Sequence, residues 1–260
     1  MNDPGPLRPT LDLNADVGEL PERLHDGREA ALLGQLSSVN LACGGHAGDE
    51  ATMTAVVRLC QELGVAIGAH PSYPDRAHFG RHRMEMGREA LVESLCTQLQ
   101  TLSAITDKAG AELAHLKPHG ALYHDAADDP SIAAIVAEAA RRSGRRLVLV
   151  GRARSRGLEA WREAGFPVAA EAFADRRYES DGSLRDRRLM GALVTDPGEV
   201  AEQGLELARG RARTPGGWLS VIADTLCLHG DTPGSEQLAA ALRQKLLAAG
   251  VRIAPLRGYS

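Results

Sequence analysis

Short apolar segments with the character of β-strands alternate with amphipathic helical segments along the whole chain. Alternation of this kind is typical of a parallel sheet whose helices pack on the outside. Seven segments have strand character, and they cover residues 11–13, 39–42, 65–69, 113–117, 147–150, 168–172 and 225–228. No proline- or serine-rich linker divides the chain. We therefore expect a flexible tail at residues 1–10 and one α/β domain, a β/α barrel, over residues 11–260.

Residues that begin and end helices support this organisation. Asp49 is suited to cap a helix that Gly64 would end, because its carboxylate can accept a hydrogen bond from the first turn. A second helix is predicted over residues 87–109, and Asp129-Pro130 opens a third. A last helix carries Leu238, Leu242 and Leu246. Residues 211–218 are predicted to form a loop or hairpin insertion.

Composition excludes several classes of function. The net charge of −4 and the 3% of aromatic residues leave neither a basic stripe nor a stacking surface for nucleic acid. Charged residues interrupt every apolar segment before about 18 positions, so no membrane-spanning helix is expected.

The first ten residues lack the features of a secretory signal, and the four cysteines have no C-x-x-C spacing, so we expect a cytoplasmic protein with reduced thiols. The chain contains neither the phosphate-binding loop G-x-x-x-x-G-K-[ST] nor the dinucleotide-binding turn G-x-G-x-x-G. We therefore expect that, if ATP is used, this chain does not bind it.

Polar side chains gather where the predicted strands end. With a period of two, Asp12, Asn14 and Asp16 share one face of the first strand, and Glu19 follows it. In parallel α/β folds this rim is where ligands bind. The alternative is that Asp12 and Asn14 only hold neighbouring loops through hydrogen bonds.

Four histidines follow four of the predicted strands. His46 lies in CGGHAGD, His70 in GAHP, His119 in LKPHG and His229 in LHGD. A lone histidine is more often a structural hydrogen-bonding group, but four at equivalent positions favour a functional site. Histidine titrates near neutral pH and is the commonest metal ligand, so proton transfer and metal binding are both open.

The sixth predicted strand adds further charged residues. Glu171 lies within it, and Asp175 and Arg176 follow. These last two residues could bind a substrate or could form a structural ion pair beneath a loop.

Six motifs in register resemble the LamB/YcsF family over residues 11–249. They are DLNADVGE, NLACGGHAGD, GAHPSYPD with a downstream FGR, LKPHGALY, EAFADRRY with a following DGSL, and CLHGDTPG. Two positions depart from the usual family pattern: Gly45 stands in place of phenylalanine, and Ser72 in place of glycine. The first departure is expected to enlarge the substrate pocket.

The resemblance implies a distorted, seven-stranded TIM-like barrel of the glycoside hydrolase and deacetylase class. It also implies the activity of 5-oxoprolinase, a complex in which the family supplies one of three kinds of chain, the A chain, and works with partner subunits B and C. The complex cleaves 5-oxo-L-proline to L-glutamate and consumes ATP, which the partner subunits would bind.

The same resemblance assigns residues by their motifs. The expected catalytic set is Asp16, Glu19, His46, His70 and His119. The expected substrate-binding set is Asp12, Asn14, Lys117, Glu171, Asp175, Arg176, His229 and Asp231.

A first hypothesis for the chemistry is addition of water to an activated lactam. A carboxylate would be the general base, Asp16 first and Glu19 second, while Lys117 and Arg176 would hold the substrate carboxylate or a phosphate. The three histidines His46, His70 and His119 would stabilise developing charge or protonate the leaving nitrogen.

Two other hypotheses for the function remain open. The chain could be a metal-dependent hydrolase of another amide or lactam, with a divalent metal on Asp16, His46 and His70. It could instead be a non-catalytic binding subunit. The density of ionisable groups at the predicted strand ends stands against that last reading.

Overall fold

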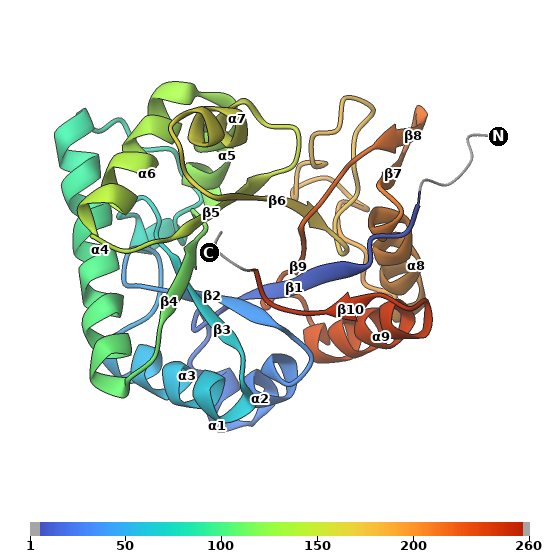
Figure 1. Ribbon diagram of the computed structural model, residues 1–260, viewed down its shortest axis with the longest axis horizontal. Helices are drawn as coiled ribbons and strands as arrows, with labels where there is room; N and C mark the ends of the chain where they lie inside the picture. Colours follow the sequence, from blue (N-terminus) through green and yellow to red (C-terminus); the bar gives the residue numbers. More distant parts are fainter. Residues whose placement is uncertain (1–5, 257–260) are drawn as a thin grey trace.

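Seven parallel strands close into a barrel, and their order around the barrel follows the chain (Figure 1). The structure is a computed structural model that describes residues 6–256. The strands are β1 (Thr10–Val17), β2 (Ser38–Ala42), β3 (Ala66–His70), β4 (Leu113–Leu116), β5 (Val148–Arg152), β6 (Val168–Phe173) and β9 (Thr225–Leu228). The barrel closes because β1 pairs with both β2 and β9. The expected seven-stranded TIM-like barrel is confirmed, and all seven predicted strands are present.

The predicted helices are confirmed as α3 (Glu50–Leu63), α4 (Arg88–Ala109), α6 (Pro130–Arg142) and α9 (Ser235–Ala248). The Asp49 carboxylate accepts a 2.8 Å hydrogen bond from the backbone of Thr52, and Gly64 ends α3 in the left-handed conformation. Both capping assignments are therefore confirmed.

Several elements were not predicted from the sequence. They are α1 (Glu22–His25), α2 (Arg28–Leu33), α5 (Gly120–Asp128), α7 (Arg156–Glu163), α8 (Pro197–Ala208) and the 3₁₀ helix Arg76–His78. The short strand β10 (Arg252–Ile253) pairs with the start of β1. The insertion expected at residues 211–218 is a hairpin that extends to Ser220, from β7 (Arg211–Thr214) and β8 (Gly217–Ser220). Within residues 6–256, no helix is both long and apolar enough to cross a bilayer.

The tail expected at residues 1–10 ends before Thr10. Residues 1–5 lie outside the described residues, and Thr10 already belongs to β1.

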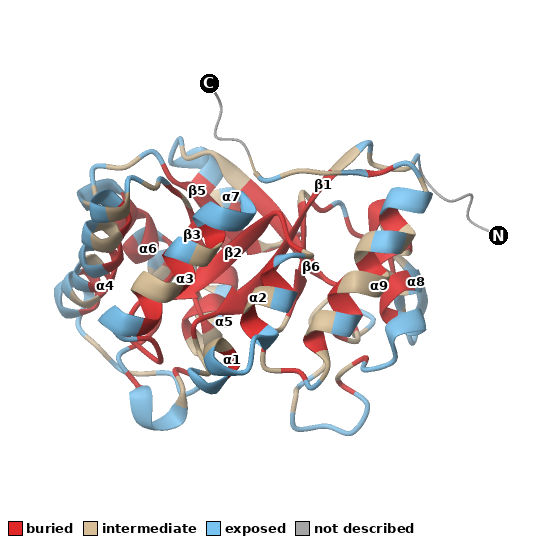
Figure 2. Cartoon of the chain, turned by 90° about the horizontal axis from the view of Figure 1, so that it is seen from below, coloured by how far each residue is buried: buried red, intermediate tan, exposed pale blue. Residues whose placement is uncertain are grey.

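The helices surround the barrel with their buried faces inward and their exposed faces outward, and the strands of the barrel are buried almost throughout (Figure 2).

The barrel interior below the strand ends is polar and hydrogen-bonded. Asp12 accepts bonds from the hydroxyls of Ser37, Ser38 and Thr225 at 2.6–2.8 Å. The Asn14 amide donates to the Thr225 hydroxyl at 2.6 Å, so that hydroxyl accepts from one neighbour and donates to the other. Buried polar groups are stable when they are satisfied in this way. This layer supports the strand ends above it.

Candidate active site

The carboxyl ends of the strands surround a cavity of about 830 Å³. Residues from several expected motifs line it, among them Asp16, Glu19, His70, Lys117, His119, Arg176, His229 and Asp231. Ligands bind at this end of β/α barrels. The structure therefore brings most of the expected residues to one place.

A buried charge cluster reaches the cavity through Asp16 and Lys117. The Lys117 ammonium lies 3.0 Å from Asp16 Oδ1 and 2.9 Å from Glu171 Oε1, and all three side chains are nearly inaccessible to solvent. Asn40 donates a second bond to Asp16 Oδ1, at 2.8 Å. Because Lys117 is already shared by two carboxylates, it is less free to hold a substrate carboxylate than the sequence suggests.

The environment keeps Asp16 ionised. Burial alone would raise its pKa, but the electrostatic interactions with the His70 ring and the Lys117 ammonium outweigh burial and hold the pKa of this carboxyl well below its usual range. The same carboxylates hold the pKa of Lys117 well above its usual range against the effect of burial. The pair therefore carries opposite charges at neutral pH.

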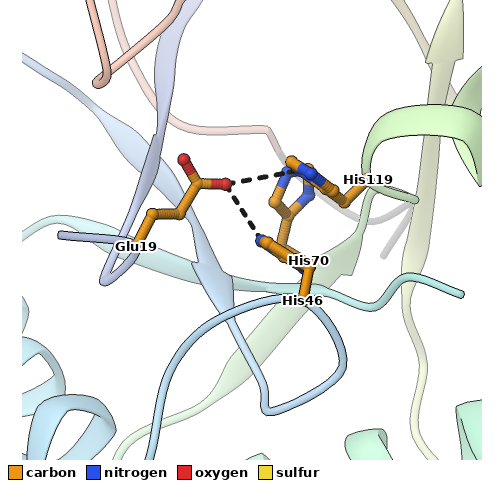
Figure 3. Close-up of side chains that lie close together, drawn as sticks. All are labelled: Glu19, His46, His70 and His119. Carbon is orange, nitrogen blue, oxygen red and sulfur yellow. Dashed lines mark hydrogen bonds and ion pairs between the residues drawn. The ribbon is translucent and has the colours of Figure 1, made fainter. Parts of the chain in front are cut away.

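Three imidazoles and one carboxylate meet beside this cluster (Figure 3). Glu19 Oε1 lies 3.0 Å from His46 Nε2 and 3.3 Å from His119 Nδ1. His119 Nδ1 is also 3.0 Å from His70 Nε2. The metal set expected from the sequence included Asp16; the structure instead groups Glu19 and His119 with His46 and His70, while Asp16 Oδ2 lies 3.4 Å from His70 Nε2.

Two glycines make this grouping possible. A Cβ at Gly48, which has a positive φ, would lie closer than 3.0 Å to the Ala42 carbonyl oxygen, so the turn carrying His46 requires glycine. A Cβ at Gly120, also at positive φ, would meet the Gly80 carbonyl oxygen, and Gly120 directly follows His119. Tight turns after β2 and β4 therefore place the two rings.

Burial sets the protonation of these groups. It raises the pKa of Glu19 to about 8, and the neighbouring negative charge of Asp16 adds to the increase. Burial also holds the pKa values of His46 and His119 well below the usual range of an imidazole. Both rings are therefore neutral at neutral pH.

The remaining expected residues follow the ends of β6 and β9. Asp175 accepts a bond from the His229 ring at 2.9 Å and another from its backbone, so its partner is His229 and not the adjacent Arg176. Asp231 pairs with Arg81 and Arg187. Arg176 donates to the Arg185 carbonyl oxygen, while its Nε is buried without a hydrogen-bond partner.

Five expected residues are not among those that line the cavity: Asp12, Asn14, His46, Glu171 and Asp175. Their expected roles stay predictions, and their contacts are those of residues that hold the lining residues in position.

The sequence analysis did not identify Asn40 and His115, which hydrogen-bond to each other at 2.9 Å inside the barrel. A polar residue within an apolar strand was the available signal, since Asn40 lies between Val39 and Leu41.

The departure at Gly45 does not enlarge the cavity. A Cβ at this buried glycine would lie closer than 3.0 Å to both Ser72 Oγ and Gln98 Oε1. None of these three residues is among those that line the cavity. The space beside Gly45 is filled by the side chains of Ser72, the second departure, and Gln98.

Comparisons with known proteins cover almost the whole chain. Residues 11–260 match the LamB/YcsF family. A protein of Chloroflexus aggregans, named as the A chain of 5-oxoprolinase, is 48% identical, over 94% of this chain and 98% of its own length. The protein of the same name in Methylococcus capsulatus is 43% identical, over 96% and 97%.

Solved structures agree with the barrel. The lactam utilization protein from Thermus thermophilus superposes with a TM-score of 0.87 at 37% identity, over 95% of this chain and all of its own. A family 4 carbohydrate esterase from Streptomyces lividans gives a TM-score of 0.53 at 11% identity, over 97% and 95%, which is a likeness of fold alone.

Proposed function

The chain belongs to the LamB/YcsF family, and from this premise we propose that it is the A chain of a 5-oxoprolinase, which opens the ring of 5-oxo-L-proline to give L-glutamate. The observation that carries the proposal is the cavity at the strand ends, where the ionised carboxylate of Asp16 lies beside His70 and a buried lysine. Two further imidazoles, His46 and His119, meet Glu19 next to them. These groups suit hydrolysis of an amide.

A five-membered lactam is a poor electrophile, so its hydrolysis requires activation. ATP would supply this if a partner subunit transferred a phosphoryl group to the amide oxygen. The activated ring would then enter the cavity of this chain. Arg81, Arg176 and Arg187 line the cavity, and guanidinium groups suit both a carboxylate and a phosphate.

Asp16 is the proposed general base. It would accept a proton from water as the water oxygen bonds to the former carbonyl carbon. The carbon–nitrogen bond would then break, and the proton that Asp16 accepted from water would pass to the ring nitrogen through His70, which lines the cavity and whose Nε2 lies 3.4 Å from Asp16 Oδ2. Hydrolysis of the remaining acyl phosphate would release glutamate and phosphate. Glu19 is the second candidate for the base.

Arg176 is the proposed anchor for the anionic substrate group. It lines the cavity, and its Nε is buried without a hydrogen-bond partner, whereas Lys117 is already held by Asp16 and Glu171. Exchange of Arg176 for methionine should therefore raise KM more than it lowers kcat.

The proposed partners are subunits B and C, which would bind ATP, and the use of ATP would place the reaction in the cytoplasm.

The test is ATP-dependent release of glutamate from 5-oxoproline by the two partner subunits, with and without this chain. We expect glutamate only when this chain is present. Release of glutamate by the partners alone would contradict the proposal and would direct attention to a different lactam or amide substrate. The matched control is the Asp16→Asn variant, which should assemble with the partners and form glutamate about 10²–10⁴-fold more slowly.

A further inference from the structure

Two imidazole nitrogens face each other at the cavity in a way that a hydrogen bond between neutral rings cannot explain. His70 Nδ1 lies 2.8 Å from the Lys117 carbonyl oxygen, and His119 Nε2 lies 2.9 Å from the Phe79 carbonyl oxygen. A carbonyl oxygen only accepts, so each of these ring nitrogens carries the hydrogen. In the neutral rings, the other two nitrogens therefore both present lone pairs, and they are 3.0 Å apart.

A third acceptor faces the same point. Glu19 Oε1 lies 3.3 Å from His119 Nδ1, the nitrogen that already faces His70, and it is an acceptor once the carboxyl is ionised, the form that a bound cation favours. Lone pairs that converge in this way repel one another unless a proton or a cation lies between them. Backbone carbonyls that fix imidazole tautomers are a common outer shell of metal-binding histidines.

The separations fit a small divalent cation. With zinc–ligand distances of about 2.0–2.1 Å, two ligands of a tetrahedral ion lie about 3.3–3.4 Å apart. The two measured separations, 3.0 Å and 3.3 Å, are close to this value. The rings of His70 and His119 are nearly perpendicular, at 85°, so their planes can intersect at one ion.

His46 has a different place in this arrangement. Its ring stacks on that of His119 with a centroid distance of 3.6 Å and an angle of 3° between the planes. Because an imidazole binds a metal in the plane of its ring, one ion cannot lie in two parallel planes. His46 instead contacts the carboxylate through Nε2, 3.0 Å from Glu19 Oε1, where it can orient that group.

We propose that His70 Nε2, His119 Nδ1 and Glu19 Oε1 form a three-ligand site for a divalent cation of the Zn²⁺ class, with its open side toward the cavity. All three ligands line the cavity, which leaves room for water or a substrate oxygen as a fourth ligand. Three protein ligands with an open position are typical of catalytic rather than structural zinc. Asp16 Oδ2, 3.4 Å from His70 Nε2, lies beside the site without being needed as a ligand. If the proposed function holds, the cation would polarise the substrate oxygen.

The test measures metal binding and not turnover, so its result is separate from that of the glutamate assay. Metal-free full-length chain would be titrated with ZnCl₂ by calorimetry, and bound zinc would be counted by elemental analysis. We expect one tightly bound equivalent, with affinity at least about 100-fold lower in Glu19→Gln and in His119→Asn. His46→Gln, which removes an orienting group, should lose about 10- to 100-fold.

Two controls keep this result interpretable. His78→Ala removes a group from a second, more exposed cluster, Asp75, His78 and His82, and should not change the tight site. Circular dichroism and thermal unfolding of the metal-free variants check that each one folds, and Co²⁺ should give the absorption of a four-coordinate ion in the parent and in His78→Ala but not in Glu19→Gln or His119→Asn.

Three results would overturn the proposal. They are the absence of tight zinc binding, binding unchanged by both ligand substitutions in folded protein, and loss of the tight site in His78→Ala alone. Absence of zinc together with a doubly protonated His70 or His119 in NMR spectra at neutral pH would assign a proton to the position between the rings.

Discussion

Asp16 and Lys117 form a buried ion pair across 101 residues of sequence, with 3.0 Å between Oδ1 and Nζ. Asp16 comes from the end of β1, and Lys117 directly follows β4. Glu171 from β6 holds the other side of the ammonium at 2.9 Å. One buried cation therefore connects three strands of the barrel, directly below the proposed reaction.

Replacement of Lys117 by methionine should destabilise the fold strongly. The change leaves Asp16 and Glu171 as buried carboxylates without their cation, which costs about 3–5 kcal/mol. The double variant Lys117→Met/Glu171→Gln removes one of the two unpaired charges and should recover part of the loss. Urea unfolding measures both changes, and a single variant as stable as the parent would show that the pair contributes little.

The Asp16→Asn variant should lose glutamate formation by a factor of about 10²–10⁴, the range of a general base. Asp12→Asn is the matched control, because Asp12 lies on the same strand and face but among hydroxyls below the cavity. It should stay within a few-fold of the parent. Equal losses in the two variants would mean that the effect comes from the barrel interior and not from the reaction.

The strands of this barrel could be predicted from sequence because each is a short, apolar segment followed by polar residues. Thr225–Leu228 has the predicted bounds, and the other six overlap theirs. The short helices α1, α2 and α7 lack enough turns to produce a clear period. Their positions depend on packing against the barrel, which a local pattern does not contain.

For the candidate site, the sequence identified residues but not their partners. Histidines after successive strands predicted a cluster, because parallel strands end at one rim. Which atoms meet depends on tautomers and turns: Glu19, and not Asp16, contacts His46, and Lys117 faces two carboxylates. These relationships arise between strands that are far apart in sequence.

Asp12 should make the stability of the fold depend on pH. Burial raises its pKa from 3.8 to about 6, although three hydroxyls donate to it. The folded state therefore binds a proton more tightly than the unfolded state. This contribution is fully present below pH 3.8 and is lost as the pH rises through about 6, with a total of about 3 kcal/mol.

The measurement compares the parent with Asp12→Asn, which cannot titrate at this position. The free energy of unfolding of the parent, minus that of the variant, should fall as the pH is raised from about 4 to about 6.5. A difference that stays constant over this range would mean that Asp12 has an ordinary pKa in the folded protein.

Gly45 and Ser72, the two departures from the family pattern, should be energetically coupled. A Cβ at Gly45 would overlap Ser72 Oγ and the Gln98 amide, and Gln98 bonds to both backbone groups of Ser72, at 2.9 Å each. Gly45→Ala should therefore destabilise the fold by about 1–3 kcal/mol through overpacking. Ser72→Gly removes one of the overlapping atoms, so the double variant should be more stable than the sum of the single changes predicts, by about 1 kcal/mol. Gly87→Ala is the control, because a Cβ there meets nothing within 4 Å and should combine additively with Ser72→Gly. Additive energies for Gly45→Ala and Ser72→Gly would show that Gln98 alone moves aside and that the two departures are independent.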